Sequence, residues 1–345
     1  MKILIISNMY PSIQKPYSGI FIKNQYEKLR EILGGNQIEI KYLNRTFTNL
    51  FGSFLKYIRF IFFLLSSYKK RYDVIHFHYF YLSVIFLPYK IFYRKTRFIV
   101  TFHGQDIIKL SSNKFLLYFF RFLAKRIDCF IPVGKEISRV MKKKLDVVAD
   151  YIIPVGVDTS IFFNNPEIVK KYDFIFVGSF YHVKGIDIII QAIKLLGDNK
   201  NEISFCFVGS GDYYLELLKL KEDGFNIDIL GTQTHKELSV LYNSSRFLIA
   251  HSRSEGFPTS SLEALYCGTP VLASNIPQYR EQIIEDKNGW LVELGNISDF
   301  LNKILTLKNK SHKQYLINSK HAENSNKKYS LNNVIEKLIK IYKND

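Results

Sequence analysis

The sequence predicts an α/β protein made of two doubly wound parts, each with a parallel sheet covered by helices. Short apolar runs recur along the chain and alternate with loops and helix-like patterns, which is the element order of parallel sheets. The chain has 345 residues, 47% of them hydrophobic, and a chain of this size more often forms two domains than one. An irregular polar stretch near residues 155–170, preceded by Pro154, marks the expected linker.

Apolar runs predict the strands of both parts. In the first part they fall at residues 2–7, 73–77, 97–102 and 129–133. In the second part they fall at residues 174–177, 203–208, 227–230, 247–250, 271–273 and 288–292. Helix patterns follow at 186–196, at 234–245 with a cap at its start, and from Thr259. Near the end, Leu331, Val334, Leu338 and Ile341 form one helical stripe, which needs another surface to cover it.

The positive charge belongs to the first part. Residues 1–155 contain 26 Lys and Arg against 9 Asp and Glu, whereas residues 156–345 contain 22 against 22, so the whole net charge of +17 lies before the linker. This asymmetry predicts an anionic partner, a nucleic acid or a membrane surface, and a solvated basic face is the alternative. Aromatic and basic residues mix at 49–71, 89–98 and 114–126, which favours an anionic membrane surface, although burial would also explain the first stretch. No nucleic-acid-binding motif accompanies the charge, so no nucleic acid partner is expected.

The cysteines and the apolar segments indicate the compartment. Cys129, Cys206 and Cys267 are widely spaced and lie at no metal-binding interval from histidines, which predicts reduced core residues of a cytosolic protein. The first apolar run is too short for a signal peptide, and no later run is long enough to cross a bilayer. We therefore expect a cytoplasmic protein, peripheral at the inner face of the membrane.

The most informative stretch is residues 252–272, SRSEGFPTSSLEALYCGTPVL. A strand, a tight loop and a helix start follow one another here, which places the loop at the carboxyl end of a strand, where open α/β sheets bind ligands. The backbone N–H groups from Thr259 to Ser261 would form an anion site at the start of the helix. Glu255 in the loop and Glu263 about one turn into the helix can face one cavity.

Other loops supply further candidates. Lys184 ends a loop that feeds a helix, where an ammonium group can neutralise a phosphate. Gly209 begins a Gly-Ser-Gly-Asp turn that only weakly resembles a dinucleotide fingerprint. In the first part, Gly19 ends the loop after the first strand, where it either lies near a phosphate or sugar or only relieves a turn.

Three histidines of the first part differ in their expected roles. His103 stands at the carboxyl end of a strand, with a glycine behind it, and is expected to face the ligand crevice. His76 and His78 lie within a strand, and we expect them to be partly buried structural residues.

The motifs resemble those of glycosyltransferase family 4, a group of retaining nucleotide-sugar transferases with the GT-B fold. The resemblance rests on HG at 103, VGSFYHVKGIDIIIQA from 177, VGSGD from 208 and SEGFPTSSLEALYCGTPV from 254, and it spans nearly the whole chain. It implies two Rossmann-like domains facing across a cleft. Residues 1–155 would bind the acceptor, residues 156–327 the nucleotide sugar, and a helix within 328–345 would pack back on the N-terminal domain.

The resemblance also implies a role for each site residue. Glu263 would bind the ribose hydroxyls and Lys184 the diphosphate. Glu255, with the backbone amides of 256–259, would bind the donor sugar and phosphates, His103 would lie beside that sugar, and Gly19 would lie near the diphosphate. The catalytic residues would then be His103, Lys184 and Glu255, and the donor-binding residues Gly19, Gly178, Ser179, Lys184, Gly209, Gly256, Phe257, Pro258, Thr259 and Glu263. No metal or cofactor is expected.

The sequence departs from the family pattern at three positions. Ser179 stands where arginine is common, which removes a positive charge from the expected diphosphate site, so that Lys184 acts alone or a base of the first domain replaces the arginine. Val155 stands where asparagine is frequent, and Pro258 where glycine is frequent.

From the resemblance we expect retaining transfer of a hexose or N-acetylhexosamine from a nucleotide-diphosphate sugar to a lipid-linked glycan of cell-surface polysaccharide biosynthesis. The alternative, favoured by Ser179, is a catalytically silent GT-B subunit that binds a glycan or a partner.

Overall fold

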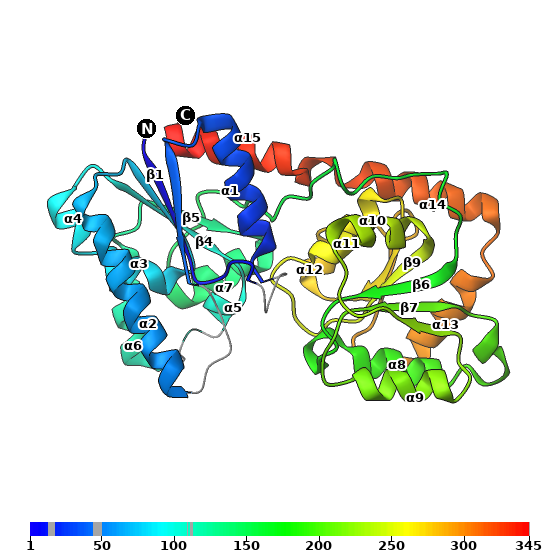
Figure 1. The fold of residues 1–345 in the computed structure, drawn as a ribbon. Helices are drawn as coiled ribbons and strands as arrows, with labels where there is room; N and C mark the ends of the chain where they lie inside the picture. Colours follow the sequence, from blue (N-terminus) through cyan, green and yellow to red (C-terminus); the bar gives the residue numbers. More distant parts are fainter. Residues whose placement is uncertain (13–17, 44–49, 109, 111–112, 345) are drawn as a thin grey trace. The chain divides into compact units, whose positions relative to one another are not determined.

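The computed structural model describes residues 1–12, 18–43, 50–108, 110 and 113–344; the side chains of 50–57, 105 and 198 are not described. The chain forms two compact units (Figure 1). Unit 1 consists of Met1–Gly156 and Leu331–Asp345, and unit 2 consists of Val157–Ser330. Each unit contains one parallel sheet and is described separately.

Unit 1 is built on a five-stranded parallel sheet with the order β2-β1-β3-β4-β5. Its strands are β1 (Ile3–Ser7), β2 (Ile38–Tyr42), β3 (Val74–His78), β4 (Arg97–Phe102) and β5 (Cys129–Pro132). Four of them correspond to predicted apolar runs, because a parallel strand covered on both faces is apolar along its length. The order reverses next to β1, so the switch point of the sheet lies between β1 and β3.

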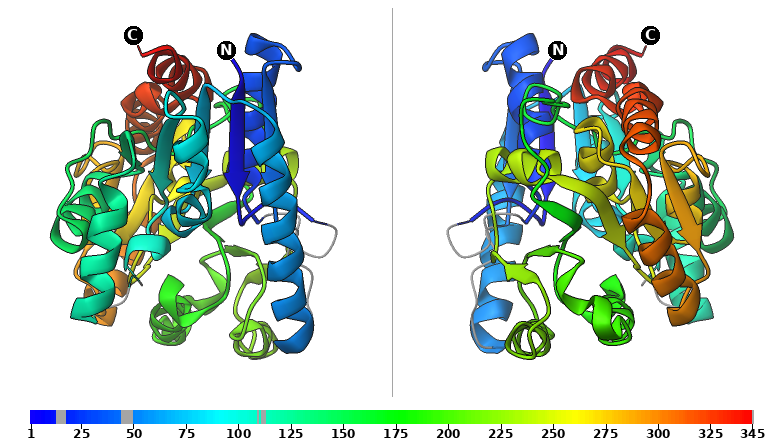
Figure 2. Two further views of the ribbon diagram at one scale, coloured as in Figure 1. Left: turned by 90° about the vertical axis from the view of Figure 1, so that its left-hand side faces the viewer. Right: turned by 90° about the vertical axis from the view of Figure 1, so that its right-hand side faces the viewer.

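Helices cover both faces of this sheet. Helices α1 (Ile20–Leu33) and α15 (Leu331–Lys343) pack on one face, where Leu29, Val334 and Leu338 join Ile3 and Ile99 in one hydrophobic cluster. The final helix therefore returns to unit 1, as the family resemblance implied, and its apolar stripe is covered there. Helices α2 (Leu50–Leu65), α3 (Phe80–Phe86) and α6 (Lys114–Ala124) lie on the opposite face (Figures 1 and 2). The remaining helices of unit 1 are η1 (Ser66–Lys69), α4 (Tyr89–Phe92), α5 (Gln105–Ile108) and α7 (Lys135–Leu145).

Unit 2 is built on a six-stranded parallel sheet with the order β11-β10-β9-β6-β7-β8. Its strands are β6 (Tyr172–Val177), β7 (Phe205–Val208), β8 (Ile227–Ile229), β9 (Ser245–Ala250), β10 (Val271–Ser274) and β11 (Gly289–Val292). All six were predicted from apolar runs. The order reverses next to β6, so the switch point lies between β6 and β9, and the loops after these two strands are the expected ligand-binding loops.

Helices also cover both faces of the unit 2 sheet. Helices α8 (Ile186–Lys194), α9 (Tyr214–Glu222) and α13 (Ile297–Lys308) pack on one face around a phenylalanine-rich cluster. Helices α10 (His235–Asn243) and α11 (Thr259–Tyr266) lie on the other face, and α14 (His312–Ser325) packs against α11 (Figure 1). The short helices η2 (His182–Lys184), η3 (Gly197–Asn201), α12 (Pro277–Arg280) and η4 (Lys327–Tyr329) complete the unit. The predicted cap of α10 is a capping box between Thr234 and Glu237.

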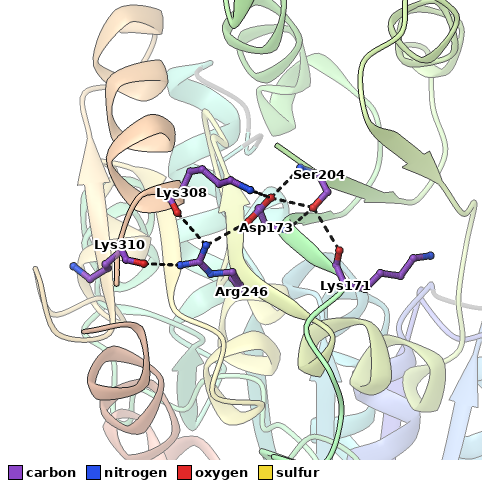
Figure 3. Close-up of polar contacts among 6 residues, drawn as sticks. All are labelled: Lys171, Asp173, Ser204, Arg246, Lys308 and Lys310. Carbon is purple, nitrogen blue, oxygen red and sulfur yellow. Dashed lines mark hydrogen bonds and ion pairs between the residues drawn. The ribbon is translucent and has the colours of Figure 1, made fainter. Parts of the chain in front are cut away.

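A polar network fastens the amino ends of the unit 2 strands (Figure 3). The carboxylate of Asp173 in β6 accepts hydrogen bonds from Lys308 Nζ (2.8 Å) and from Arg246 (3.4 Å). It also accepts hydrogen bonds from the backbone N–H and from the hydroxyl of Ser204, each at 3.0 Å. Arg246 also donates to the carbonyls of Lys308 and Lys310. Burial raises the pKa of Asp173, but Lys308 and Ser204 outweigh it, so the pKa lies below its ordinary value and the group stays ionised. The network joins β6, β9 and the end of α13 at the edge opposite the ligand-binding loops.

The three cysteines are free and buried, as predicted for core residues. Cys129 lies in β5, Cys206 in β7, and Cys267 directly follows α11. In the described part of the chain, no helix has the length and apolar character needed to span a bilayer.

Candidate active site

The predicted site residues fall into two groups, one at the carboxyl edge of each sheet. In unit 2, Gly178 follows β6 and Gly209 follows β7. A Cβ on Gly209 would lie 1.9 Å from the carbonyl oxygen of Gly178, and the φ of Gly209 is +143°, so only glycine fits this position. Ser179 is the next residue after Gly178 and is partly buried. The backbone after β6, which carries Gly178 and Ser179, therefore lies in direct contact with the backbone after β7, which carries Gly209.

A second close approach joins the loop after β6 to the end of β9. Gly185 has φ +66°, and a Cβ on it would lie 1.9 Å from the carbonyl oxygen of His251. Nearby, the backbone N–H of Arg253 donates to the carbonyl of Val183 at 2.9 Å. The short helix that carries Lys184 is therefore held against the loop that carries Glu255.

Lys184 and Glu255 form an ion pair in which Nζ and Oε1 are 2.6 Å apart. The hydroxyl of Ser252 donates to the same Oε1 at 2.7 Å, and Gln278 Nε2 donates to the Glu255 carbonyl at 2.9 Å. The hydroxyl of buried Tyr279 in turn donates to Ser252 Oγ at 3.3 Å. No residue in the described ranges donates to Oε2 of Glu255, so this oxygen can accept a hydrogen bond from a ligand.

Arg253 is a second cation in these loops, and no motif in the sequence marks it. Its guanidinium makes two parallel hydrogen bonds of 2.7 Å to the carboxylate of Asp187 in the first turn of α8. Burial raises the pKa of Asp187, but Arg253 outweighs it, so the pKa of this carboxyl lies below its ordinary value. Arg253 is thus held and neutralised by Asp187.

Helix α11 begins directly after the Glu255 loop. Gly256 and Phe257 lead to Pro258, which occupies the N-cap position, and Thr259 is the first helical residue. Proline has no side-chain acceptor, and within the described residues no side-chain cap bonds the first N–H groups of this helix. The buried ring of Phe257 packs edge-on against Tyr329. The amides from Thr259 onward therefore keep the character of an anion site.

Glu263 lies in α11 and has a different partner from Glu255. Its Oε2 accepts a hydrogen bond from the hydroxyl of Tyr242 at 3.1 Å. Burial raises the pKa of Glu263 to about 7, although Tyr242 acts in the opposite direction. The carboxyl group therefore keeps its proton to a higher pH than an ordinary glutamate does.

In unit 1, His103 lies beside the switch point of the sheet. Its Nε2 shares a hydrogen bond of 2.9 Å with Nδ1 of His78, the last residue of β3. The carboxylate of Asp106 accepts the backbone N–H groups of His103 (3.1 Å) and Gly104 (2.9 Å) and so fixes the turn. Burial lowers the pKa of His103 to about 3, which keeps the ring neutral.

Gly19 belongs to the same cluster of unit 1. It precedes α1 with φ +69°, and a Cβ on it would lie 2.7 Å from the carbonyl of Met9 in the loop after β1. Phe21, in the first turn of α1, has its ring centroid 4.9 Å from that of His103. The first turn of α1 therefore packs both on the loop after β1 and on His103.

His76 and His78 are buried, more fully than expected from the sequence. His76 makes structural contacts, since its two ring nitrogens bond Tyr342 and Thr101. His78 contacts His103 instead, which the sequence did not predict. Within the ranges that the structure describes, no group of three His, Cys, Asp or Glu side chains is arranged as a metal site.

Comparisons with known proteins agree on one family. A model described as Glycosyltransferase Family 4 matches residues 24–161, and one described as Glycosyl transferases group 1 matches residues 157–327. An uncharacterized glycosyltransferase of Methanocaldococcus jannaschii is 29% identical, with 98% of each chain covered. A poly(ribitol-phosphate) alpha-N-acetylglucosaminyltransferase of Staphylococcus aureus is 31% identical over 46% of this chain and 33% of its own length.

Solved structures agree on the fold. An Anabaena protein in complex with UDP has a TM-score of 0.77 at 15% identity, with both chains covered in full. The same protein in complex with UDP-glucose has a TM-score of 0.74 at 16% identity, again with full coverage. The predicted GT-B fold, two α/β units with a returning C-terminal helix, is thus confirmed. The chain belongs to glycosyltransferase family 4.

The close approach at Gly185 generates a stability prediction. Gly185→Ala places a methyl group against a backbone carbonyl, so we expect it to lower the free energy of unfolding of unit 2 by about 3 kcal/mol or more. The matched control is Gly197→Ala, because Gly197 also has positive φ (+57°) but no atom within 4 Å of the added Cβ. Only the backbone conformation is strained there, at a cost of about 1–2 kcal/mol.

Urea unfolding followed by tryptophan fluorescence measures both variants. Trp290, the one tryptophan of the chain, is buried in β11 and therefore reports on unit 2. Equal losses in the two variants would contradict the steric argument.

Proposed function

We propose that this glycosyltransferase moves a hexose or N-acetylhexosamine from a nucleotide-diphosphate sugar to a glycan acceptor, with retention of the anomeric configuration and without a metal ion. The observation that carries the proposal is the Lys184–Glu255 pair at the switch point of unit 2, directly before the uncapped start of α11. Departure of a nucleoside diphosphate leaves negative charge on its terminal phosphate. A fixed ammonium group and the N–H groups of a helix start stabilise that charge.

The donor is assigned to unit 2. Lys184 contacts the diphosphate together with the amides of residues 256–259, and Gly178, Ser179 and Gly209 allow the backbone to approach the ligand. The complexes of the Anabaena relative with UDP and with UDP-glucose support a nucleotide-sugar donor. Arg253 is held by two parallel hydrogen bonds to Asp187, whereas Lys184 makes a single one, to Glu255. We therefore assign Lys184 to the phosphates in place of the arginine missing at Ser179.

The ion pair suggests how binding prepares the reaction. Without ligand, Lys184 and Glu255 neutralise each other across 2.6 Å. The donor phosphates compete for Lys184, and this competition leaves the Glu255 carboxylate to accept hydroxyl groups of the transferred sugar. In unit 1, His103 contacts that sugar and Gly19 lies near the diphosphate.

A donor panel tests the activity. Incubation with UDP-, GDP-, ADP- and dTDP-sugars is expected to give hydrolysis or transfer with one nucleotide class, and the anomeric configuration of the product, read by NMR, is expected to match the donor. Lys184→Ala and Glu255→Ala are each expected to lower kcat by roughly 10² to 10³, the usual effect of removing one group that stabilises transition-state charge. EDTA is expected to leave the rate unchanged.

The control for this panel is Lys194→Ala, which removes an exposed lysine at the end of α8 and should have no effect. Full activity in both site variants would refute the assigned residues. Donor binding without turnover by the wild-type protein would favour the silent-subunit alternative.

The raised pKa of Glu263 predicts that donor affinity depends on pH. Ribose hydroxyls donate to the carboxylate and therefore favour its ionised form, so affinity is full above the pKa of about 7 and declines as the pH falls through it. We expect the Kd of a nucleotide sugar to be about tenfold higher at pH 6 than at pH 8, as measured by calorimetry. Glu263→Gln should bind weakly at both pH values. An equally steep pH dependence in Glu263→Gln would assign the titration to another group.

We assign the acceptor to a glycan that is carried by lipid at the cytoplasmic face of an anionic membrane. The support is an aromatic face of unit 1, which we define as the exposed apolar side chains of α2, α4 and α6. Phe62, Phe92 and Phe115 are 68%, 74% and 79% exposed, and Phe63, Ile91, Tyr118, Phe119 and Phe122 are also exposed. Exposed apolar side chains gathered in this number on one unit are typical of membrane or protein contacts.

The charges around the aromatic face fit an anionic surface. Residues 50–105 contain one acidic residue, Asp73, and residues 107–127 contain none. Exposed bases border the aromatics, among them Arg94, Lys95, Lys125 and Arg126. Basic residues near an anionic leaflet contribute about 1 kcal/mol each.

Liposome sedimentation at physiological salt tests this assignment. The protein is expected to bind vesicles with anionic lipid, and the double variant Lys125→Ala/Arg126→Ala is expected to bind roughly 30-fold more weakly, as two lost charges predict. Phe115→Ser/Phe122→Ser should weaken binding to anionic and zwitterionic vesicles alike. Phe163→Ser, at an exposed phenylalanine of unit 2, is the matched control. If the wild-type protein does not bind anionic vesicles, the membrane assignment is ruled out, and the donor assignment is unaffected.

A further inference from the structure

Unit 1 contains a histidine pair at the carboxyl edge of its sheet. His78 ends β3, and His103 directly follows β4. Side chains alternate along a strand, so His78 lies on the same face as His76, which contacts Tyr342 of α15. The rings of His78 and His103 stack with centroids 5.2 Å apart and planes 18° apart, and Nδ1 of His78 shares a hydrogen bond of 2.9 Å with Nε2 of His103.

This hydrogen bond commits one ring nitrogen of each histidine. A neutral imidazole has one donor and one acceptor nitrogen, so the role of Nε2 in His103 also decides the role of Nδ1. If Nε2 donates, Nδ1 is an acceptor, and if Nε2 accepts, Nδ1 carries the proton. Burial lowers the pKa of His103 to about 3 and the pKa of His78 well below its ordinary value, so both rings are neutral at pH 7.

The neighbouring His76 takes no part in this hydrogen bond. Its Nδ1 shares a hydrogen bond of 2.7 Å with the hydroxyl of Tyr342, and its Nε2 shares one of 2.7 Å with the hydroxyl of Thr101. Both nitrogens are thereby engaged, and the ring meets that of His78 by stacking, with centroids 4.6 Å apart. His76 therefore joins β3 to α15 without setting the tautomer of His103.

We propose that His78 is a positioning residue for the transferase reaction: it holds His103 in one tautomer and leaves Nδ1 of His103 as the ring nitrogen that meets a hydroxyl of the transferred sugar. This inference rests on the proposed function, in which His103 contacts that sugar. His78 lies at the switch point between β1 and β3, where open α/β sheets bind ligands. A partner that fixes the second nitrogen of a functional histidine typically contributes 10- to 100-fold, as second-shell partners of metal-bound histidines do.

Three variants separate positioning from packing. His78→Phe keeps an aromatic ring beside His103 but removes the hydrogen bond, and it is expected to lower kcat about 10- to 100-fold with little change in the KM for the nucleotide sugar, which unit 2 holds. His78→Asn places an amide near the position of Nδ1 and is expected to retain most of kcat. Tyr342→Phe removes a buried hydrogen bond of His76 and is expected to lower stability with kcat unchanged.

Nitrogen NMR of histidine-labelled protein reads the tautomer directly. In the wild-type protein and in His78→Asn, His103 is expected to show one protonated and one unprotonated ring nitrogen. In His78→Phe, exchange between tautomers is expected to average the two signals. Signals are assigned by their loss in His103→Ala.

Two results would overturn the proposal. One is a His103 tautomer that is the same in His78→Phe as in the wild type, and the other is a loss of kcat in His78→Asn as large as in His78→Phe. A wild-type protein that turns over no nucleotide sugar would instead overturn the proposed function, and the nitrogen signals would still decide whether His78 fixes the tautomer.

Discussion

The candidate site of unit 2 depends on two places where backbone meets backbone without room for a side chain. Gly185 lies against the carbonyl of His251, and Gly209 lies against the carbonyl of Gly178. These contacts bring the loops after β6, β7 and β9 together, so that Lys184 reaches Glu255. A partly exposed ion pair contributes little to stability by itself. The backbone therefore holds the loops in place, and the two charged side chains remain available to a ligand that competes for them.

In unit 1, the alternation of side chains along two strands produces a similar division of roles. His76 and His78 are two residues apart in β3, and Thr101 and His103 are two residues apart along β4 and the residue after it. Because His78 is paired with Thr101 in the sheet, all four side chains face the same side. The inner pair, His76 and Thr101, meets α15 and is structural. The outer pair lies where the strands end, at the position at which parallel sheets present ligand-binding groups. One repeated spacing thus supplies both a core contact and a candidate functional contact.

The strands could be predicted because parallel strands buried on both faces are continuous apolar runs. β2 was missed because it is an edge strand that alternates apolar and charged residues. α14 was missed because Asn318 and Ser319 belong to its buried face, which leaves no apolar stripe. α13 has such a stripe, at Phe300, Ile304 and Leu307, and its pattern could have been recognised.

Sequence motifs predicted Lys184, Glu255, Glu263 and His103 as site residues, because these residues stand at fixed places relative to predicted strand and helix ends. The contacts that these loops and side chains make with distant residues could not be predicted from the sequence in the same way. The pairing of Arg253 with Asp187 joins residues 66 positions apart, and the contact between His78 and His103 depends on the register of β3 with β4. Such pairs are made by tertiary structure. The same limit applies to α15, because its apolar stripe predicted a partner surface without identifying it.

Because Leu331, Val334 and Leu338 complete the hydrophobic cluster of the first sheet, unit 1 needs contacts between segments that lie on both sides of unit 2 in the chain. The surface assigned to the acceptor is therefore carried by a unit whose core is complete only when the last helix has packed.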